Sequence, residues 1–132
     1  MQTPQKEVII PTGGAKPLAP YSPGMRAGQF VYTSGQIGLD PATGKLAPGG
    51  VQAQAKQALE NLKAVLEAAG ASLESVVKVT IFMQDIGDYA AINEIYGSYF
   101  TADPPARSAV QVAALPAGAL VEVEAVALVN AA

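Results

Sequence analysis

D-P-P-A-R-S-A-V-Q-V-A-A-L-P-A-G-A-L-V-E-V-E, residues 103–124, is an apolar stretch with an arginine near its start and two glutamates at its end. Arg107 begins one strand-like run, and Glu122 and Glu124 lie within the next. A buried charge is costly unless it is paired, so such groups are either partnered within the fold or held for a ligand. The rest of the sequence bears on whether these charges have a partner within the fold or bind a ligand.

The same stretch fixes the end of the predicted fold, because Pro104-Pro105 stop a helix and two strands are expected after them. The apolar period predicts the elements in this order: a strand at 8–10, a proline-stiffened loop at 16–24, strands at 29–38 and 75–85, helices at 51–69 and 89–100, and strands at 106–114 and 120–129. We therefore expect one α+β domain over 1–132, with a single sheet and two helices on one face.

The composition restricts the possible chemistry. The chain has 132 residues, no cysteine and no histidine, so thiolate chemistry, a cysteine-based zinc site and a histidine base are all excluded. Any catalysis must rely on carboxylates, tyrosine, backbone groups and positioning, and we expect neither a metal nor a cofactor.

The charge balance and the apolar content bear on partners and location. A net charge of -3 argues against binding to nucleic acid or to an anionic membrane. Half of the residues are hydrophobic and only 14% are charged, so we expect another subunit to cover part of the surface. No apolar run is long enough to span a bilayer and no signal pattern occurs in residues 1–15, so we expect a cytoplasmic protein.

The usual catalytic motifs are missing. Neither glycine-rich phosphate loop occurs, a serine–histidine triad is impossible, and Glu122 and Glu124 are only same-face neighbours on one strand. What remains is Arg107, whose planar fork fits a carboxylate or a phosphate through two parallel hydrogen bonds.

Three other positions have both a structural and a functional interpretation. Tyr21, on the proline-stiffened loop, is either a packing lid or a ligand contact. Ser34-Gly35 ends or bulges its strand, and such a bend can also present an N–H group to an anion. Asn93 lies off the apolar stripe of the second helix, where a surface position is the ordinary interpretation.

Asp88 is the expected N-cap of the second helix, and the aromatic residues of that helix are expected in the core.

An ion pair between Arg107 and Glu122 can be tested by geometry. If the last two strands formed a tight hairpin, Glu122 would face Val112, and Arg107 would lie five residues further along, roughly 17 Å away. If another strand intervened, the two charges would again not be direct neighbours. They can instead meet at a boundary between subunits.

Several segments, in this order, resemble the RidA family of reactive-intermediate deaminases. They are A-P-Y-S-P-G at 19–24, Y-T-S-G-Q-I at 32–37, Q-A-L-E-N-L-K-A-V-L-E-A-A-G at 57–70, N-E-I-Y-G-S-Y-F at 93–100, and P-P-A-R-S-A-V-Q-V-A-A-L-P-A-G-A-L-V-E-V-E-A-V-A from Pro104. The resemblance implies a chorismate-mutase-like fold whose last two strands are not sheet neighbours. It also implies a homotrimer with an inner barrel and three sites between subunits.

The resemblance also assigns roles to particular residues. It implies that Arg107 and the N–H of Gly35 hold a substrate carboxylate, and that Glu122 holds the attacking water. It gives the pocket lining as Tyr21, Ser34, Ala109 and Asn93. Some relatives carry cysteine where this chain has Ala109, so a thiol is not required here. Glu124 is interpreted as a structural or surface carboxylate.

The implied reaction is the hydrolysis of 2-aminoacrylate-type enamines and 2-imino acids to 2-oxo acids and ammonia. A non-catalytic regulatory trimer that binds 2-oxo acids would use the same arginine. Ribonuclease activity fits poorly with the acidic balance and the lack of histidine. Chorismate mutase activity rests on fold similarity alone.

Overall fold

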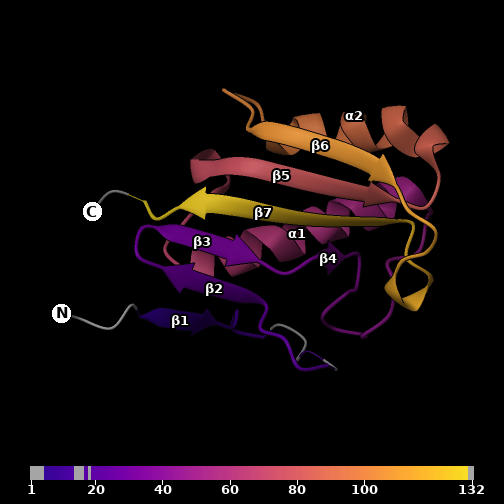
Figure 1. The fold of residues 1–132 in the computed structure, drawn as a ribbon. Coiled ribbons are helices and arrows are strands. Elements are labelled where there is room, and N and C mark those ends of the chain that lie inside the picture. The colour runs from indigo at the N-terminus through magenta and orange to yellow at the C-terminus, as the bar shows by residue number, and fades with distance from the viewer. Residues whose placement is uncertain (1–4, 14–16, 18, 131–132) are drawn as a thin grey trace.

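The structure is a computed structural model that describes residues 5–13, 17 and 19–130. Seven strands form one sheet in the order β1-β2-β3-β7-β5-β6, with β4 paired to β7, and both helices lie behind this sheet in Figure 1. The strands are β1 (Lys6–Ile9), β2 (Gly24–Ala27), β3 (Phe30–Thr33), β4 (Gln36–Ile37), β5 (Val76–Met83), β6 (Ala106–Gln111) and β7 (Val121–Leu128). The helices are α1 (Val51–Ala68) and α2 (Tyr89–Tyr99). The predicted α+β class with two helices on one face is confirmed.

The centre of the sheet is β7, which pairs antiparallel with β3, β4 and β5. Strand β6 lies at the edge and pairs parallel with β5, reached through α2. Because β5 separates β6 from β7, the last two strands are not neighbours, as the family resemblance implied. The tight hairpin is therefore excluded.

The core lies between the sheet and α1. The predicted helix at 51–69 is confirmed to within one residue, and Gly70 follows it with a φ of 79°. Large side chains from both layers are fully buried there, among them Leu59, Leu62, Leu66, Val79, Ile81, Val121 and Val123. Each such side chain contributes about 1.5–3 kcal/mol through its burial.

The N-terminal part differs from the prediction at several points, and the strand expected at 8–10 is β1 at Lys6–Ile9. Strand β2 was not expected, because G-M-R-A contains no β-branched or aromatic residue, and only its pairing with β1 and β3 makes it a strand. The predicted strand at 29–38 splits into β3 and β4 around Ser34-Gly35. Within the predicted loop at 16–24, Lys16 and Leu18 lie outside the described residues.

The start of α2 corrects two predictions. Asp88 is at the N-cap position, but its side chain makes no capping hydrogen bond; instead Asp85 accepts one from the backbone N of Gly87 at 2.8 Å. Tyr89 is 43% exposed and does not join the core, because the first turn of α2 reaches the edge of the sheet. Core burial on α2 is limited to Ile92 and Tyr96, and Phe100, which follows the helix, is also buried.

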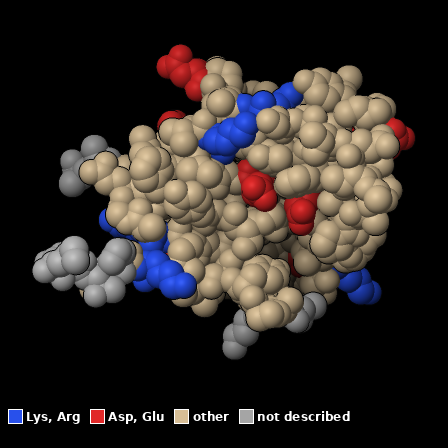
Figure 2. Space-filling model, viewed as in Figure 1, with Lys and Arg blue, Asp and Glu red and all other residues tan. Residues whose placement is uncertain are grey.

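We call the sheet surface opposite the helices the open face. It is mostly uncharged, with acidic side chains near its centre (Figure 2). Large hydrophobic side chains are exposed on it, namely Val8, Phe30, Tyr32, Val110 and Leu128. Within the part of the chain that the structure describes, neither helix combines the length and the apolar character needed to cross a membrane.

Candidate active site

Arg107 lies on the helix side of the edge strand β6. Its register partner on β5 is Val79, which is fully buried in the core, so the two side chains share the face covered by the helices. Nη2 of Arg107 donates a hydrogen bond to Oη of Tyr89 at 2.9 Å. The guanidinium carbon also lies 4.7 Å from the ring centroid of Tyr96. Two aromatic residues of α2 therefore support the charged fork from one side.

Ala109 and Asn93 lie near this arginine. Ala109 follows two residues later on β6, on the same face, level with the buried Ile81. Asn93 is half-buried on α2, four positions after Tyr89 and three before Tyr96, which places all three on one side of the helix. We call Arg107, Ala109 and Asn93 the arginine half-site. Asn93 stays partly exposed, which is compatible with the expected surface position, and its place in the site stays a prediction.

Glu122 lies on the open face, level with Phe82 of β5 and Ile37 of β4. Its carboxyl packs directly against Gly35, where an added Cβ would lie 2.6 Å from Cδ of Glu122. Burial raises the pKa of the Glu122 carboxyl, and the neighbouring charge of Glu124 raises that pKa further. The carboxyl is therefore a better base than an ordinary surface glutamate.

Gly35 and Ser34 form a β-bulge, as the sequence suggested. Tyr32 pairs with Val126 and Gln36 with Val123, so four residue steps on one strand face three on the other. Ser34 is fixed there, since its Oγ donates to the backbone O of Ser22 at 2.6 Å. The bulge opens the backbone beside Glu122.

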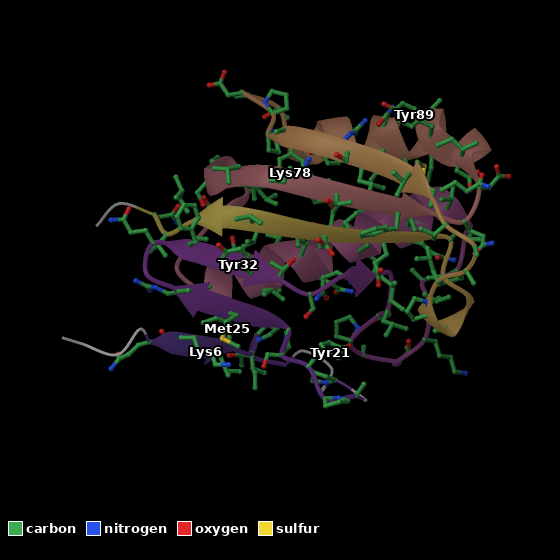
Figure 3. All side chains as sticks on the ribbon, in the orientation of Figure 1. Lys6, Tyr21, Met25, Tyr32, Lys78 and Tyr89 are labelled. Atoms are coloured by element: carbon green, nitrogen blue, oxygen red, sulfur yellow. The ribbon has the colours of Figure 1, made fainter. Side chains whose placement is uncertain are left out.

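Tyr21 lies one residue before Ser22 on the proline-stiffened loop and is 53% exposed. Its side chain does not act as a lid over the core of this chain. We call Tyr21, Ser34, Gly35 and Glu122 the glutamate half-site. Figure 3 shows Tyr21 near the lower edge of the molecule and Tyr89 near its upper edge.

The two half-sites do not meet within one chain. Arg107 is level with Val79 and Ala125, three residues along β7 from Glu122, and the two side chains point to opposite faces of the sheet. Two strand spacings and three residue steps place their Cα atoms roughly 14 Å apart. An ion pair within the subunit is therefore excluded, in agreement with the geometric prediction.

Sequence reasoning missed Tyr89 as a member of the site. It lies 18 positions before Arg107, and its spacing on α2 is that of a core residue. Only the parallel pairing of β6 beside β5 brings the arginine under the first turn of the helix. Across the described residues, no cluster of three or more His, Cys, Asp or Glu side chains could hold a metal ion.

A family model described as endoribonuclease L-PSP matches residues 13–129. The chain therefore belongs to the RidA family, the class that its motifs resembled. The 2-iminobutanoate/2-iminopropanoate deaminase of Mus musculus is 48% identical over 123 residues, which cover 93% of this chain and 91% of the relative. A RutC family protein of Pyrococcus horikoshii is also 48% identical, over 92% of this chain and 97% of its own.

Solved structures agree with this assignment. The structure of a Yersinia pestis protein of the conserved Rid family has a TM-score of 0.91 and 41% identity, and the match covers 95% of this chain and 100% of that one. The structure of E. coli TdcF with bound serine has a TM-score of 0.89 and 42% identity, covering 94% and 99% of the two chains. The fold expected from the family resemblance is thereby confirmed.

Proposed function

We propose that this protein is a cofactor-independent deaminase that hydrolyses 2-aminoacrylate-type enamines and 2-imino acids to 2-oxo acids and ammonia. The observation that carries the proposal is the chemistry of the two half-sites: a supported arginine fork and a half-buried carboxyl with a raised pKa. Relatives from Mus musculus and Rattus norvegicus that bear the name 2-iminobutanoate/2-iminopropanoate deaminase are 48% and 46% identical to it, which supports the same reaction.

The proposed active form is a homotrimer with its sites between subunits. The two half-sites are different surfaces of one chain, so a contact that joins them is heterologous, and such contacts form a ring when the rotation between copies closes. The exposed hydrophobic side chains of the open face supply a surface that such a ring would cover. In this assembly Arg107 of one copy and Glu122 of the next face the same ligand.

Arg107 binds the substrate carboxylate through two parallel hydrogen bonds, and the N–H of Gly35 adds a third. The enamine first tautomerises to the 2-imino acid. Glu122 then takes a proton from a water molecule, whose oxygen attacks the C=N carbon. The imine nitrogen receives this proton from Glu122, which gives the carbinolamine. The C–N bond then breaks as the hydroxyl proton passes through Glu122 to the leaving nitrogen, and the products are the 2-oxo acid and ammonia. Because such imines hydrolyse slowly in water alone, orientation and one placed base are sufficient.

The test is an assay of ammonia and pyruvate release from 2-aminoacrylate generated in place. We expect Arg107→Ala to abolish the acceleration, since the carboxylate loses its fork. Arg26→Ala is the matched control: it removes the only other arginine, also half-buried on a strand, and keeps activity. An unchanged rate in Arg107→Ala would overturn the proposal.

Glu122→Gln separates binding from chemistry. The amide keeps the shape of the side chain but cannot take a proton, so we expect turnover to fall by about a hundredfold or more. Pyruvate binding, measured by calorimetry, should stay close to that of the wild type. A loss of binding with no separate effect on turnover would make Glu122 a structural residue.

A regulatory trimer that binds 2-oxo acids is the alternative favoured by the arginine half-site, because a carboxylate fork serves binding as well as catalysis. Pyruvate binding that depends on Arg107, without ammonia release from any imine, would establish it. The description of the family model also names an endoribonuclease, but the net charge of -3 gives this candidate little support. RNA digestion by the wild type and its loss in Arg107→Ala would favour it.

A further inference from the structure

We infer that Tyr89 is a positioning residue for Arg107: its hydroxyl fixes the guanidinium in the orientation that receives a ligand carboxylate. The inference rests on the proposed function of the arginine half-site. Tyr89 stands at the first turn of α2, and 43% of its surface is exposed at the edge of the sheet. Nevertheless its Oη accepts a 2.9 Å hydrogen bond from Nη2 of Arg107.

The two aromatic residues restrict different motions of the arginine. The ring of Tyr96 lies under the guanidinium carbon at 4.7 Å, a contact that holds the group against the helix but leaves it free to turn. The hydrogen bond to Tyr89 acts on one nitrogen and removes that rotation. Since β6 is an edge strand, no further strand among the described residues lies beside it to support the side chain. The orientation of the fork therefore depends on Tyr89.

The hydrogen bond to Tyr89 leaves the arginine able to bind a carboxylate. A guanidinium has five N–H donors, and Nη2 carries two of them, one shared with each of its two-donor edges. Whichever hydrogen Tyr89 accepts, the other edge of Arg107 keeps both donors. The hydroxyl acts as an acceptor in this contact, so its own hydrogen stays free to donate to the ligand.

The experiment compares Tyr89→Phe with Tyr99→Phe. The second variant also removes a hydrogen bond made by a tyrosine hydroxyl of α2, the 2.7 Å bond from Tyr99 Oη to Glu60. This bond does not involve Arg107. Pyruvate is titrated into the wild type and both variants by calorimetry, and KM and kcat are measured with generated 2-aminoacrylate. We expect Tyr89→Phe to raise Kd and KM about fivefold to tenfold with kcat nearly unchanged. Tyr99→Phe should leave all three unchanged.

A second readout needs no ligand. NMR of the Arg107 guanidinium group reports how fast it rotates, and we expect faster rotation in Tyr89→Phe but not in Tyr99→Phe. Wild-type pyruvate binding with an unchanged Kd in Tyr89→Phe would overturn this inference alone. So would an equal loss of affinity in both variants, because that would reflect a general effect on α2. Failure of the wild type itself to bind pyruvate would overturn the proposed function together with this inference.

Discussion

Glu122 shows how strongly one residue depends on its surroundings. Its neighbours in β7 on either side are fully buried valines, but the side chain of Glu122 points to the open face and packs against Gly35. Burial, and then the charge of Glu124, raises the pKa of its carboxyl. Because a base must be ionised to accept a proton, we expect this raised pKa to set the acid limb of the proposed deaminase activity.

We predict that Glu124→Gln moves that acid limb to lower pH. The substitution removes the negative neighbour, so the pKa of Glu122 falls toward its ordinary value and the base stays ionised in more acidic solution. The measurement is the pH dependence of kcat, with the exposed Glu67→Gln on α1 as the control. A limb that stays in place in Glu124→Gln would contradict the assignment of the limb to Glu122.

The raised pKa of Glu122 also makes the stability of the protein depend on pH. A carboxyl whose pKa is raised in the folded state stabilises the protein at low pH, and that contribution is lost as the pH rises through the raised pKa. Glu122→Gln should therefore gain stability relative to the wild type at neutral pH and lose this advantage in acid. After solvent screening the difference should stay below about 1 kcal/mol.

Gly35→Ala should lower activity without lowering stability. An added Cβ would lie 2.6 Å from Cδ and 2.8 Å from Oε2 of Glu122, the movable end of a side chain. The carboxyl would swing away, so we expect turnover to fall at least about tenfold while the thermal midpoint barely changes. Thermal unfolding and the deaminase assay on the same preparation check this.

Gly38→Ala is the matched contrast. There the added Cβ would lie 2.6 Å from the backbone O of Gln54, inside helix α1, which cannot move aside in the same way. We expect the free energy of unfolding to fall by about 1–3 kcal/mol. Equal stability losses at Gly35 and Gly38 would show that Glu122 is held rigidly.

At the scale of elements, the sequence predicted the helices and strands whose own residues show a clear local pattern. Helix α1 has an apolar stripe and a closing glycine, and β5 has an unbroken run of strand-forming residues. Strand β2 has no such signal, because its partners β1 and β3 impose its conformation. The motifs also named the residues of both half-sites, whose roles stay predictions, but not Tyr89, whose contact with Arg107 follows from tertiary pairing that no local pattern encodes.

A glycine in helix α2 allows helix propensity to be tested without a change in side-chain packing. Nothing lies within 4 Å of a Cβ added at Gly97, so Gly97→Ala should raise the free energy of unfolding by about 0.5–1 kcal/mol in chemical denaturation. At Gly70 an added Cβ would make only ordinary contacts, with Val129 and Arg26, but φ is +79°, so Gly70→Ala should lower stability instead. A gain at both positions would contradict the conformation assigned to Gly70.

For the whole molecule, the main question is what covers the open face. The sheet order separates Arg107 from Glu122 and leaves apolar side chains exposed. No local sequence pattern predicts this order. Long-range pairing of β7 with β3, β4 and β5 decides that order. The family resemblance anticipated one part of this order, namely that the last two strands are not neighbours.

We predict that Tyr32→Glu dissociates the proposed trimer. Tyr32 lies on the open face and is 47% exposed in one chain, so an added charge would be buried on assembly (Figure 3). Light scattering should give the mass of a single chain, 13.4 kDa, where the wild type gives about three times as much. Activity should be lost with the trimer. Lys56→Glu, on the exposed side of α1, should change neither.

The central place of β7 also governs how the protein can be made. Every other strand and both helices precede β7 in the order of synthesis, yet β3 and β5 are joined only through it. The two halves of the sheet therefore stay apart on the ribosome until residues 121–128 have emerged. Until then the nascent chain exposes the unpaired edges of β3 and β5, which makes this interval the one in which chaperones matter most.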